Sequence, residues 1–290
     1  MYLRKKTVLK TLTAIFLAMI IAAIPFNYAN AAGSATTFDE YTVFDSEEST
    51  VTIIDINEDG DWGYTLKVNI ENNSSDTTYM YSTEFAKLNG VCVTPYFSCE
   101  VKPGKKANGN IEFYLSDEEE ELIGDITDIY LVMHAYDSND WSADDLFEEE
   151  FHIYPYGKKN ASEVTRKDQK TDVLLAESDD IKFVLTDTDM DDVWGLELNV
   201  YMVNYTDKRV VFILDDASIN GYMIDVYWAN YLLPDSQAID DICFYPEDLE
   251  EIGITDEDDI EKIEFTFRVY DADDYYADDI YYEEIVLTAN

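Results

Sequence analysis

The chain has 290 residues, of which 63 are Asp or Glu and 19 are Lys or Arg, giving a formal net charge of −44 at pH 7. Binding to nucleic acid or to an anionic membrane needs clustered cations, so this charge argues against both partners. Abundant aromatic and β-branched residues, placed periodically, argue against a disordered chain, because they supply the surface of a folded core.

The first 31 residues have the pattern of a secretory signal peptide. Four basic residues within positions 4–10 precede the apolar stretch TLTAIFLAMIIAAIPF, and Ala29 and Ala31 are small residues that suit cleavage after position 31. This apolar stretch is short for a membrane span, which takes roughly 20 residues. We therefore expect an extracellular protein, secreted or associated with the cell envelope, with no membrane span after cleavage. Cleavage removes four basic residues and no acidic ones, so the formal charge becomes −48.

The remaining chain consists of two halves that repeat each other in order. WGYTLKVNIENNSSD at 62–76 returns as WGLELNVYMVNYTD at 194–207, and AKLNGVCV at 86–93 returns as ASINGYMI at 217–224. Such internal similarity indicates duplication within one chain. The predicted organisation is a signal peptide at 1–31, a first domain at 37–156, a basic polar linker at 157–171 and a second domain at 172–290.

The linker at 157–171 has no apolar periodicity and holds five Lys or Arg residues. Two interpretations are open for its positive charge. It either holds the two acidic domains together, or it belongs to a solvated tether. The tether is the preferred interpretation.

Inside each half, apolar and polar residues alternate with a period of two. In YTLKVNIEN, Leu66, Val68 and Ile70 alternate with polar residues, which is typical of a strand with one buried face. Asn89-Gly90 and Asn220-Gly221 lie between apolar runs and predict two-residue hairpin turns. We expect an all-β protein of two tandem antiparallel immunoglobulin-like β-sandwich domains, each of seven or eight strands. A barrel is the alternative, and residues 118–124 and 246–253 are each expected to form one helical turn.

Three segments of the first half resemble a known family. IENNSSD, LNGVCVTPYFSCEVKPGKKANGNIEFY and YLVMHAYDSNDW are similar to immunoglobulin-like domains of secreted proteins from Gram-positive bacteria, of the "immunoprotective extracellular" type. The second half departs from this pattern, since Ser236 and Gln237 replace Lys105 and Lys106. The resemblance implies the sandwich fold and an extracellular location, and it brings no catalytic residue.

Two acidic turns at matching positions are candidate calcium sites, because calcium prefers oxygen ligands. A helix–loop–helix calcium loop needs a bidentate acid at its twelfth position, where Leu66 and Leu198 stand instead. Asn, Asp and Gly are also common in hairpin turns, and a plain turn is the preferred interpretation. The candidate ligands are Asp55, Asn57, Asp59, Asp187, Asp189 and Asp191.

A second pair of candidate calcium sites is formed by DSNDWSADD at 137–145 and DADDYYADD at 271–279. Clustered carboxylates repel one another unless a cation screens them, which suits a calcium site of modest affinity. The alternative is a solvated hairpin loop whose Trp141 or Tyr275 packs back on the sandwich. The candidate ligands are Asp137, Asp140, Asp144, Asp271, Asp274 and Asp278.

The same loops suggest a binding surface, since exposed Tyr and Trp rings give rigid contact area with a polar edge. The candidate binding residues are Trp141, Tyr275, Tyr276 and Tyr281. The alternative is that these rings are divided between the core and a sheet face.

Catalytic motifs are missing from the sequence. His134 and His152 are its two histidines, and neither stands in a zinc-ligand pair or a recognised triad motif. Cys92, Cys99 and Cys243 are too few for a disulfide scaffold. Free thiols are the expectation, with a Cys92–Cys99 bridge as the alternative.

We therefore expect a non-enzymatic binding or interaction module whose partner is an unknown protein or glycan on the cell surface. One alternative is an envelope-associated spacer stiffened by calcium. A third is an acid–base hydrolase, which would need two close carboxylates in a cleft.

Overall fold

The computed structural model describes Lys5–Lys6 and residues 38–289, with positions 141 and 192 excepted. The predicted signal peptide lies outside the described residues apart from Lys5–Lys6, which form the short strand β1. Within the described part of the chain, most regular structure is strand, and all strand pairings are antiparallel except β1 with β20 and β6 with β18. The prediction of an all-β, antiparallel protein is confirmed.

The first unit consists of two sheets that share one apolar core. One sheet has the order β2-β3-β4-β9-β7, and the other has β11-β10-β5, with β6 and β8 both paired to β5. The strands are β2 Tyr41–Asp45, β3 Ser49–Gly60, β4 Gly63–Asn72, β5 Tyr79–Leu88, β6 Val91–Val93, β7 Pro95–Tyr96, β8 Ser98–Val101, β9 Lys105–Phe113, β10 Ile129–Asp137 and β11 Phe147–Ile153.

The second unit has the same order of pairings around a separate core. One sheet is β12-β13-β14-β18, and the other is β20-β19-β15, with β16 and β17 both paired to β15. The strands are β12 Val173–Glu177, β13 Ile181–Asp191, β14 Gly195–Asn204, β15 Val210–Ile219, β16 Tyr222–Met223, β17 Ala229–Leu232, β18 Ser236–Phe244, β19 Lys262–Asp271 and β20 Tyr281–Thr288.

The sheets of both units are open and pack as layers, so the arrangement is sandwich-like and the barrel alternative is wrong. The predicted alternation holds within the strands. Leu66, Val68 and Ile70 are fully buried on β4, and on β19 every second residue is buried. Apolar burial on one face of each strand is the main source of stability for such layers.

Both predicted hairpin turns are confirmed. Asn89 and Gly90 have φ of 51° and 86° and connect β5 to β6, while Asn220 and Gly221 have φ of 52° and 83° and connect β15 to β16. Positive φ at both turn positions matches the twist of a two-residue hairpin, and Asn and Gly are the residues that adopt it at least cost.

One buried asparagine closes the end of a central strand in each unit, β4 in the first and β14 in the second. Asn72 donates to the carbonyls of Thr77 (2.9 Å) and Val101 (2.7 Å) and accepts from the backbone of Ser74 (3.0 Å). In the same way, Asn204 donates to the carbonyls of Lys208 (2.7 Å) and Leu233 (2.8 Å) and accepts from the backbone of Thr206 (2.9 Å). The repeated sequence segments therefore contain a repeated hydrogen-bond network.

The two helical turns that the sequence predicts are present as short helices. Helix α1, Asp117–Ile123, begins after Ser116, whose hydroxyl accepts from the backbone of Glu119 in a capping box. Helix α2, Pro246–Glu251, has its proline in the first turn, where no intrahelical amide bond is lost. In the chain, α1 follows β9 and α2 follows the corresponding strand β18.

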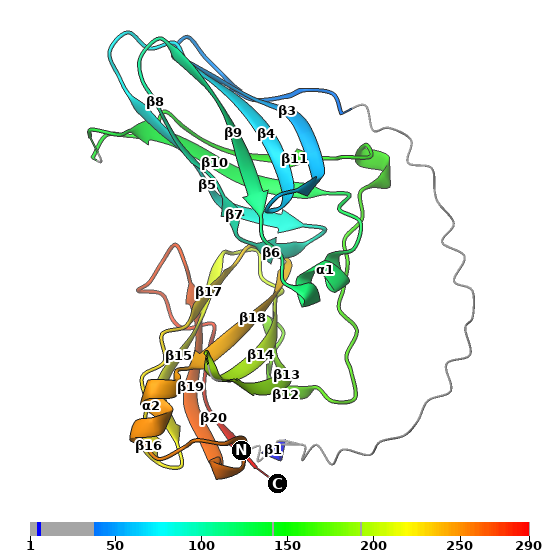
Figure 1. The fold of residues 1–290 in the computed structure, drawn as a ribbon, viewed down its shortest axis with the longest axis vertical. Helices are drawn as coiled ribbons and strands as arrows, with labels where there is room; N and C mark the ends of the chain where they lie inside the picture. Colours follow the sequence, from blue (N-terminus) through cyan, green and yellow to red (C-terminus); the bar gives the residue numbers. More distant parts are fainter. Residues whose placement is uncertain (1–4, 7–37, 141, 192, 290) are drawn as a thin grey trace, which may run out of the picture.

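Direct contacts join the two units. Strand β6 pairs with β18 in parallel through Val91 and Gln237, so one nine-stranded sheet runs through both units. Beside this pair, the Cys92 thiol lies 3.1 Å from the Ser236 hydroxyl, and Lys87 Nζ donates to the Pro234 carbonyl at 3.2 Å. Figure 1 shows β6 and α1 at this junction, and α2 and β16 at the opposite end of the second unit.

The segment 157–171 also binds both units. The backbone amide of Val164 donates to the Asn89 carbonyl in the first unit (2.9 Å), and its carbonyl accepts from Gln237 Nε2 in the second unit (2.6 Å). Most of the segment is exposed, as expected for a polar linker. At Val164, an uncharged residue, the linker is nevertheless fixed in the junction.

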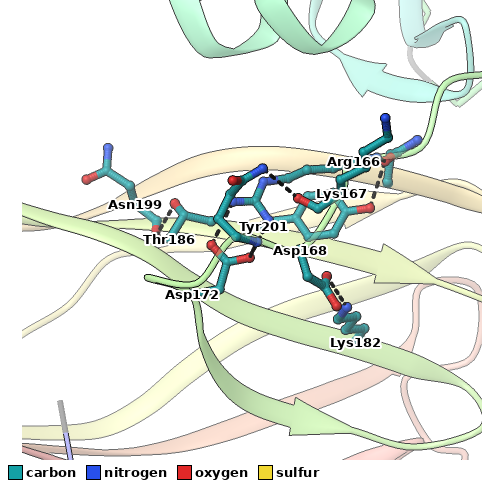
Figure 2. Close-up of polar contacts among 10 residues, drawn as sticks. Arg166, Lys167, Asp168, Asp172, Lys182, Thr186, Asn199 and Tyr201 are labelled. Atoms are coloured by element: carbon teal, nitrogen blue, oxygen red, sulfur yellow. Dashed lines mark hydrogen bonds and ion pairs between the residues drawn. The ribbon is translucent and has the colours of Figure 1, made fainter. Parts of the chain in front are cut away.

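Two ion pairs lie at the end of the linker, and Arg166 is the linker cation that takes part in one of them (Figure 2). The Arg166 guanidinium donates to both carboxylate oxygens of Asp172, at 2.7 and 2.8 Å, and lies 5.2 Å over the Tyr201 ring. Asp168 accepts from Lys182 at 2.6 Å. Arg166 holds the pKa of Asp172 below its usual range. These pairs attach the end of the linker to the second unit rather than bridging the two units.

Candidate functional site

The first pair of predicted calcium turns lies at the tips of the β3–β4 and β13–β14 hairpins. Asp55 accepts from Lys67 at 2.7 Å, and this hydrogen bond lowers the pKa of the Asp55 carboxyl. In the second unit, Asp191 accepts from the backbone amides of Trp194 and Val193, both at 2.6 Å, and its pKa is also lowered. The two turns therefore satisfy their carboxylates differently.

The oxygen ligands of each turn do not converge. Asn57 and Asp59 are exposed at alternate positions of β3, and residues two apart on a strand are about 6.6 Å apart. Asp187 and Asp189 are arranged in the same way on β13 and accept from the backbone amides of the residues that follow them. Among the residues that the structure describes, no group of three or more His, Cys, Asp or Glu is placed to hold a metal ion.

The two acidic loops 137–145 and 271–279 have the same internal bonds. Asp137 accepts from the backbone of Asn139, and Asp271 from that of Asp273, both at 2.9 Å. Asp140 accepts from Ser142 and Asp274 from Tyr276, again at the backbone, at 3.1 and 3.2 Å. Asp144 and Asp278 are exposed, and Trp141 lies outside the described residues. Calcium binding at these loops stays a prediction.

The predicted tyrosine surface is only partly assembled. Tyr275 and Tyr276 are adjacent and exposed, with 60% and 95% of their surface in contact with solvent. Arg268 lies 5.5 Å from the Tyr275 ring. Tyr281 differs, because its ring packs on Phe267 in the core at 5.6 Å and its hydroxyl donates to a neighbouring glutamate. This residue is therefore better assigned to the core than to a binding surface.

A more complete site lies in the first unit, where the sequence analysis proposed none. An open hollow of about 930 Å³ is formed by the start of β2, the edge strand β11 and the turn that follows β11. Its lining is mainly aromatic, with polar groups at intervals. The lining residues that bear on binding are Phe38, Asp39, Tyr41, Glu150, Phe151, His152, Tyr154, Tyr156, Lys158 and Asn160.

The rings of the hollow are held in two stacked pairs. Tyr41 stacks on Phe151 with centroids 5.6 Å apart, and His152 stacks on Tyr154 at 5.5 Å with an angle of 9° between planes. Lys158 lies 5.6 Å over the Tyr154 ring. Phe151 is buried in the core, so Tyr41 provides the accessible ring of the first pair, and the stacking fixes its orientation.

Hydrogen bonds position the polar rim of the hollow. His152 Nδ1 is 2.6 Å from an oxygen of Asp128, which leaves Nε2 with no hydrogen-bond partner among the described residues. The Tyr156 hydroxyl donates to Glu58 at 2.7 Å, and this bond raises the pKa of Tyr156 to about 12. Asn160 Nδ2 donates to the Tyr156 carbonyl at 2.6 Å, which fixes the turn.

The signal for this site in the sequence is the segment HIYPYGKKN at 152–160, where aromatic and basic residues follow a strand. The predicted boundary between residues 156 and 157 divides this segment between the first domain and the linker, so its residues are not predicted to form one surface. Tyr41, which completes the hollow, is over a hundred residues away in sequence, and only the pairing of the sheets brings it there.

A second arrangement that the sequence did not reveal lies on the outer face of β5 and β10. His134 Nε2 is 2.7 Å from the Ser82 hydroxyl, and His134 Nδ1 is 3.2 Å from an oxygen of Asp145. A serine, a histidine and an aspartate in this order form the relay used in nucleophilic catalysis. At the corresponding position of the second unit, Arg268 replaces His134 and pairs with Asp279 at 2.7 Å.

All three cysteines are free thiols. Cys92 is in the junction between the units and Cys99 lies on β8, and burial raises the pKa of both thiols. Burial and the acids around Cys243 raise its pKa to about 11. These thiols are poor nucleophiles at neutral pH, since the thiolate is the reactive form.

No protein-family model matches the chain, and no curated protein matches it. In the part of the chain that the structure describes, no helix is long and apolar enough to cross a bilayer. The function is therefore inferred from the geometry of the molecule itself.

Proposed function

We propose that the protein is an extracellular, non-enzymatic binding module of two tandem immunoglobulin-like sandwich units, and that the aromatic hollow of its first unit binds a neutral oligosaccharide. The tandem organisation is supported by the matching strand order of the two units. The extracellular location is supported by the signal peptide pattern at 1–31. The resemblance to immunoglobulin-like domains of secreted Gram-positive proteins agrees with both parts of the proposal.

The observation that carries the binding proposal is the pair of stacked ring couples, Tyr41 with Phe151 and His152 with Tyr154, in an open hollow. A sugar ring has a flat face of C–H groups that packs on an aromatic ring, and hydroxyls around its edge that need hydrogen-bond partners. His152 Nε2 and Asn160 are placed near the rings as such partners.

The charge of the protein selects the kind of oligosaccharide. The formal charge of −48 after the predicted cleavage repels sulfated or uronic-acid glycans. Asp39 and Glu150 line the hollow itself and add local repulsion against an anionic ligand. A neutral or N-acetylated sugar chain therefore fits the site best.

The test is a glycan array probed with residues 32–290, with Tyr154→Ala and Tyr276→Ala as variants. We expect binding to neutral glycans, a loss of about tenfold or more in affinity for Tyr154→Ala, and no change for Tyr276→Ala. Tyr276 is highly exposed in the loop of the other unit and so is a matched control. Absence of binding to any glycan, or loss only in Tyr276→Ala, would overturn the proposal.

The calcium-stiffened spacer is the alternative for an envelope protein, and the fixed junction between the units supports it. A spacer needs constant length rather than a ligand. Cell fractionation distinguishes the two, because a spacer stays with the envelope when the hollow is altered by Tyr154→Ala. A binding module would be released into the medium.

Hydrolysis is a second candidate function, favoured by the distances of 2.7 and 3.2 Å that connect Ser82, His134 and Asp145. In this function the Ser82 oxygen attacks an ester carbonyl, His134 takes the hydroxyl proton and returns it to the leaving alcohol, and water then releases the acid. Labelling by a fluorophosphonate probe that is lost in Ser82→Ala would support it. No labelling of the wild type would exclude it.

A further inference from the structure

At the junction between the two units, the β5–β6 hairpin of the first unit contacts the start of strand β18 in the second unit. The β5–β6 turn presents the Gly90 carbonyl, which accepts from the Gln237 backbone amide at 3.3 Å at the start of β18. Val91 is fully buried there, and the Cys92 thiol contacts both Ser236 and the backbone of Leu233. The contact is heterologous, because a turn on one unit meets a strand start on the other.

The second unit carries the same hairpin end, and there it is exposed. By sequence correspondence, Tyr222 and Met223 of β16 occupy the positions of Val91 and Cys92 after the matching Asn-Gly turn. Their exposed fractions are 59% and 67%, and nearby Tyr227 is 84% exposed. Such a group of apolar side chains at the end of a unit is typical of an interaction surface. Figure 1 shows β16 at the end of the molecule farthest from the first unit.

The first unit carries the matching strand start. Lys105 and Lys106 of β9 correspond to Ser236 and Gln237 of β18, as the sequence comparison indicates. Among the described strands, β9 pairs with β4 along its length and with β7 only at Glu112 and Phe113. The outer edge of β9 at Lys106 is therefore open, as the edge of β18 would be without β6.

The charges of the two free ends are complementary. Exposed Asp215, Asp216 and Asp225 flank the β16 end, while the turn and strand start of β9 hold exposed Lys102, Lys105 and Lys106. This arrangement is notable in a chain with only 19 basic residues. Opposite charges on the two ends guide approach and fix its orientation.

We propose that copies of this chain associate head to tail, with the β16 end of one copy seated on the start of β9 in the next. The occupant of the β16 end is thus a second copy of the same chain, and the internal junction is its template. A heterologous contact of this kind does not close on itself after two copies, so it extends into a larger ring or an open filament. The proposal does not depend on the oligosaccharide or on the hollow.

The contact between copies is weaker than the internal one. In the internal junction the backbone of Val164 adds one hydrogen bond to the Asn89 carbonyl and one from the Gln237 side chain, and the covalent connection supplies an effective concentration in the mM range. The net negative charge of the chain also opposes association. Added salt screens this long-range repulsion, since the Debye length falls to about 3 Å at 1 M.

The test measures the mass of residues 32–290 by sedimentation velocity and light scattering from about 10 µM to about 1 mM, the range that the internal effective concentration suggests. We expect the average mass to rise with concentration past that of a dimer and to rise further in 0.5 M salt than in 0.15 M. A monomer at every concentration, or a mass that stops at a dimer, would overturn the proposal.

Two surface variants separate the two halves of the contact. Met223→Lys alters only the β16 end, and Lys106→Glu alters the start of β9 and breaks the exposed ion pair of Lys106 with Glu71. Both side chains are well exposed, and an exposed pair contributes little to stability, so the fold is expected to be unchanged. Each variant alone is expected to be monomeric, with Tyr276→Lys as a matched control that still assembles. An unchanged melting temperature verifies the fold of each variant.

Mixing the two variants gives the sharpest result. The Lys106→Glu chain keeps an intact β16 end and the Met223→Lys chain keeps an intact β9 start, so the mixture has one good contact. At the other contact the two introduced charges are opposite, so we expect one-to-one association of the two variants that neither variant shows alone. A mixture that remains monomeric, or assemblies that persist in either single variant, would refute the head-to-tail geometry.

Discussion

Replacing Asn72 by alanine is expected to destabilise the first unit strongly, although the side chain is small. Asn72 is 1% exposed and its amide makes four hydrogen bonds, two as donor and two as acceptor, with the loop that follows β4 and with β8. Alanine removes all four and leaves buried backbone groups without these partners.

The size of the effect follows from these bonds. Each net hydrogen bond contributes about 1 kcal/mol. The Ser74 hydroxyl also donates to the Thr77 carbonyl at 2.8 Å, so that carbonyl keeps one partner. We expect a loss of about 2–4 kcal/mol in the free energy of unfolding of this unit. Asn204→Ala in the second unit should cost a similar amount, because Thr206 has the same double role there.

The assay is urea unfolding followed by tryptophan fluorescence, with Asn72→Asp as a control. At pH 7 a carboxylate at position 72 faces two carbonyls, so this variant should be at least as unstable as Asn72→Ala. Losses below about 1 kcal/mol in both Asn72→Ala and Asn204→Ala would refute the view that these two side chains hold the strand ends.

Gly195→Ala should lower the melting temperature in calorimetry far more than Gly221→Ala. Both residues have positive φ, but at Gly195 an added Cβ would lie 2.1 Å from the backbone oxygen of Phe244, while at Gly221 it would meet open space. Stability measured by urea unfolding should rise as pH falls from 7 toward the ordinary carboxyl range, because burial raises the pKa of Glu119 and the folded state then favours its neutral form. It should fall again below about pH 4, since the pKa of Asp172 is lowered in the folded state and its stabilising charge is lost there. Calcium at about 1 mM should raise the melting temperature through the loops 137–145 and 271–279, and an unchanged curve would contradict calcium binding.

The sequence predicted those parts of the fold that depend on local pattern. The period-two alternation that gave β4 and β19 follows from the geometry of a single strand. The Asn89-Gly90 and Asn220-Gly221 turns could be predicted because few residues accept positive φ at two successive positions. Matching sequence segments also indicated which strands would correspond in the two units.

The candidate sites were harder to predict because they depend on strands that meet from distant parts of the chain. Ser82 and His134 become neighbours through the pairing of β5 with β10, and Tyr41 reaches Phe151 only through the packing of two sheets. Acidic residues that are close in sequence do not by themselves predict a metal site in a chain with 63 of them. Strand geometry spreads Asp55, Asn57 and Asp59 along β3. Composition alone does not reveal which side chains converge.

The most direct test of the binding proposal is isothermal titration calorimetry of residues 32–290 with a neutral N-acetylated oligosaccharide. Among the described residues, the hollow and its two ring pairs lie in the first unit. The account predicts one ligand per chain and loss of the heat in Tyr154→Ala. Two ligands per chain, or binding unaffected by Tyr154→Ala, would contradict it.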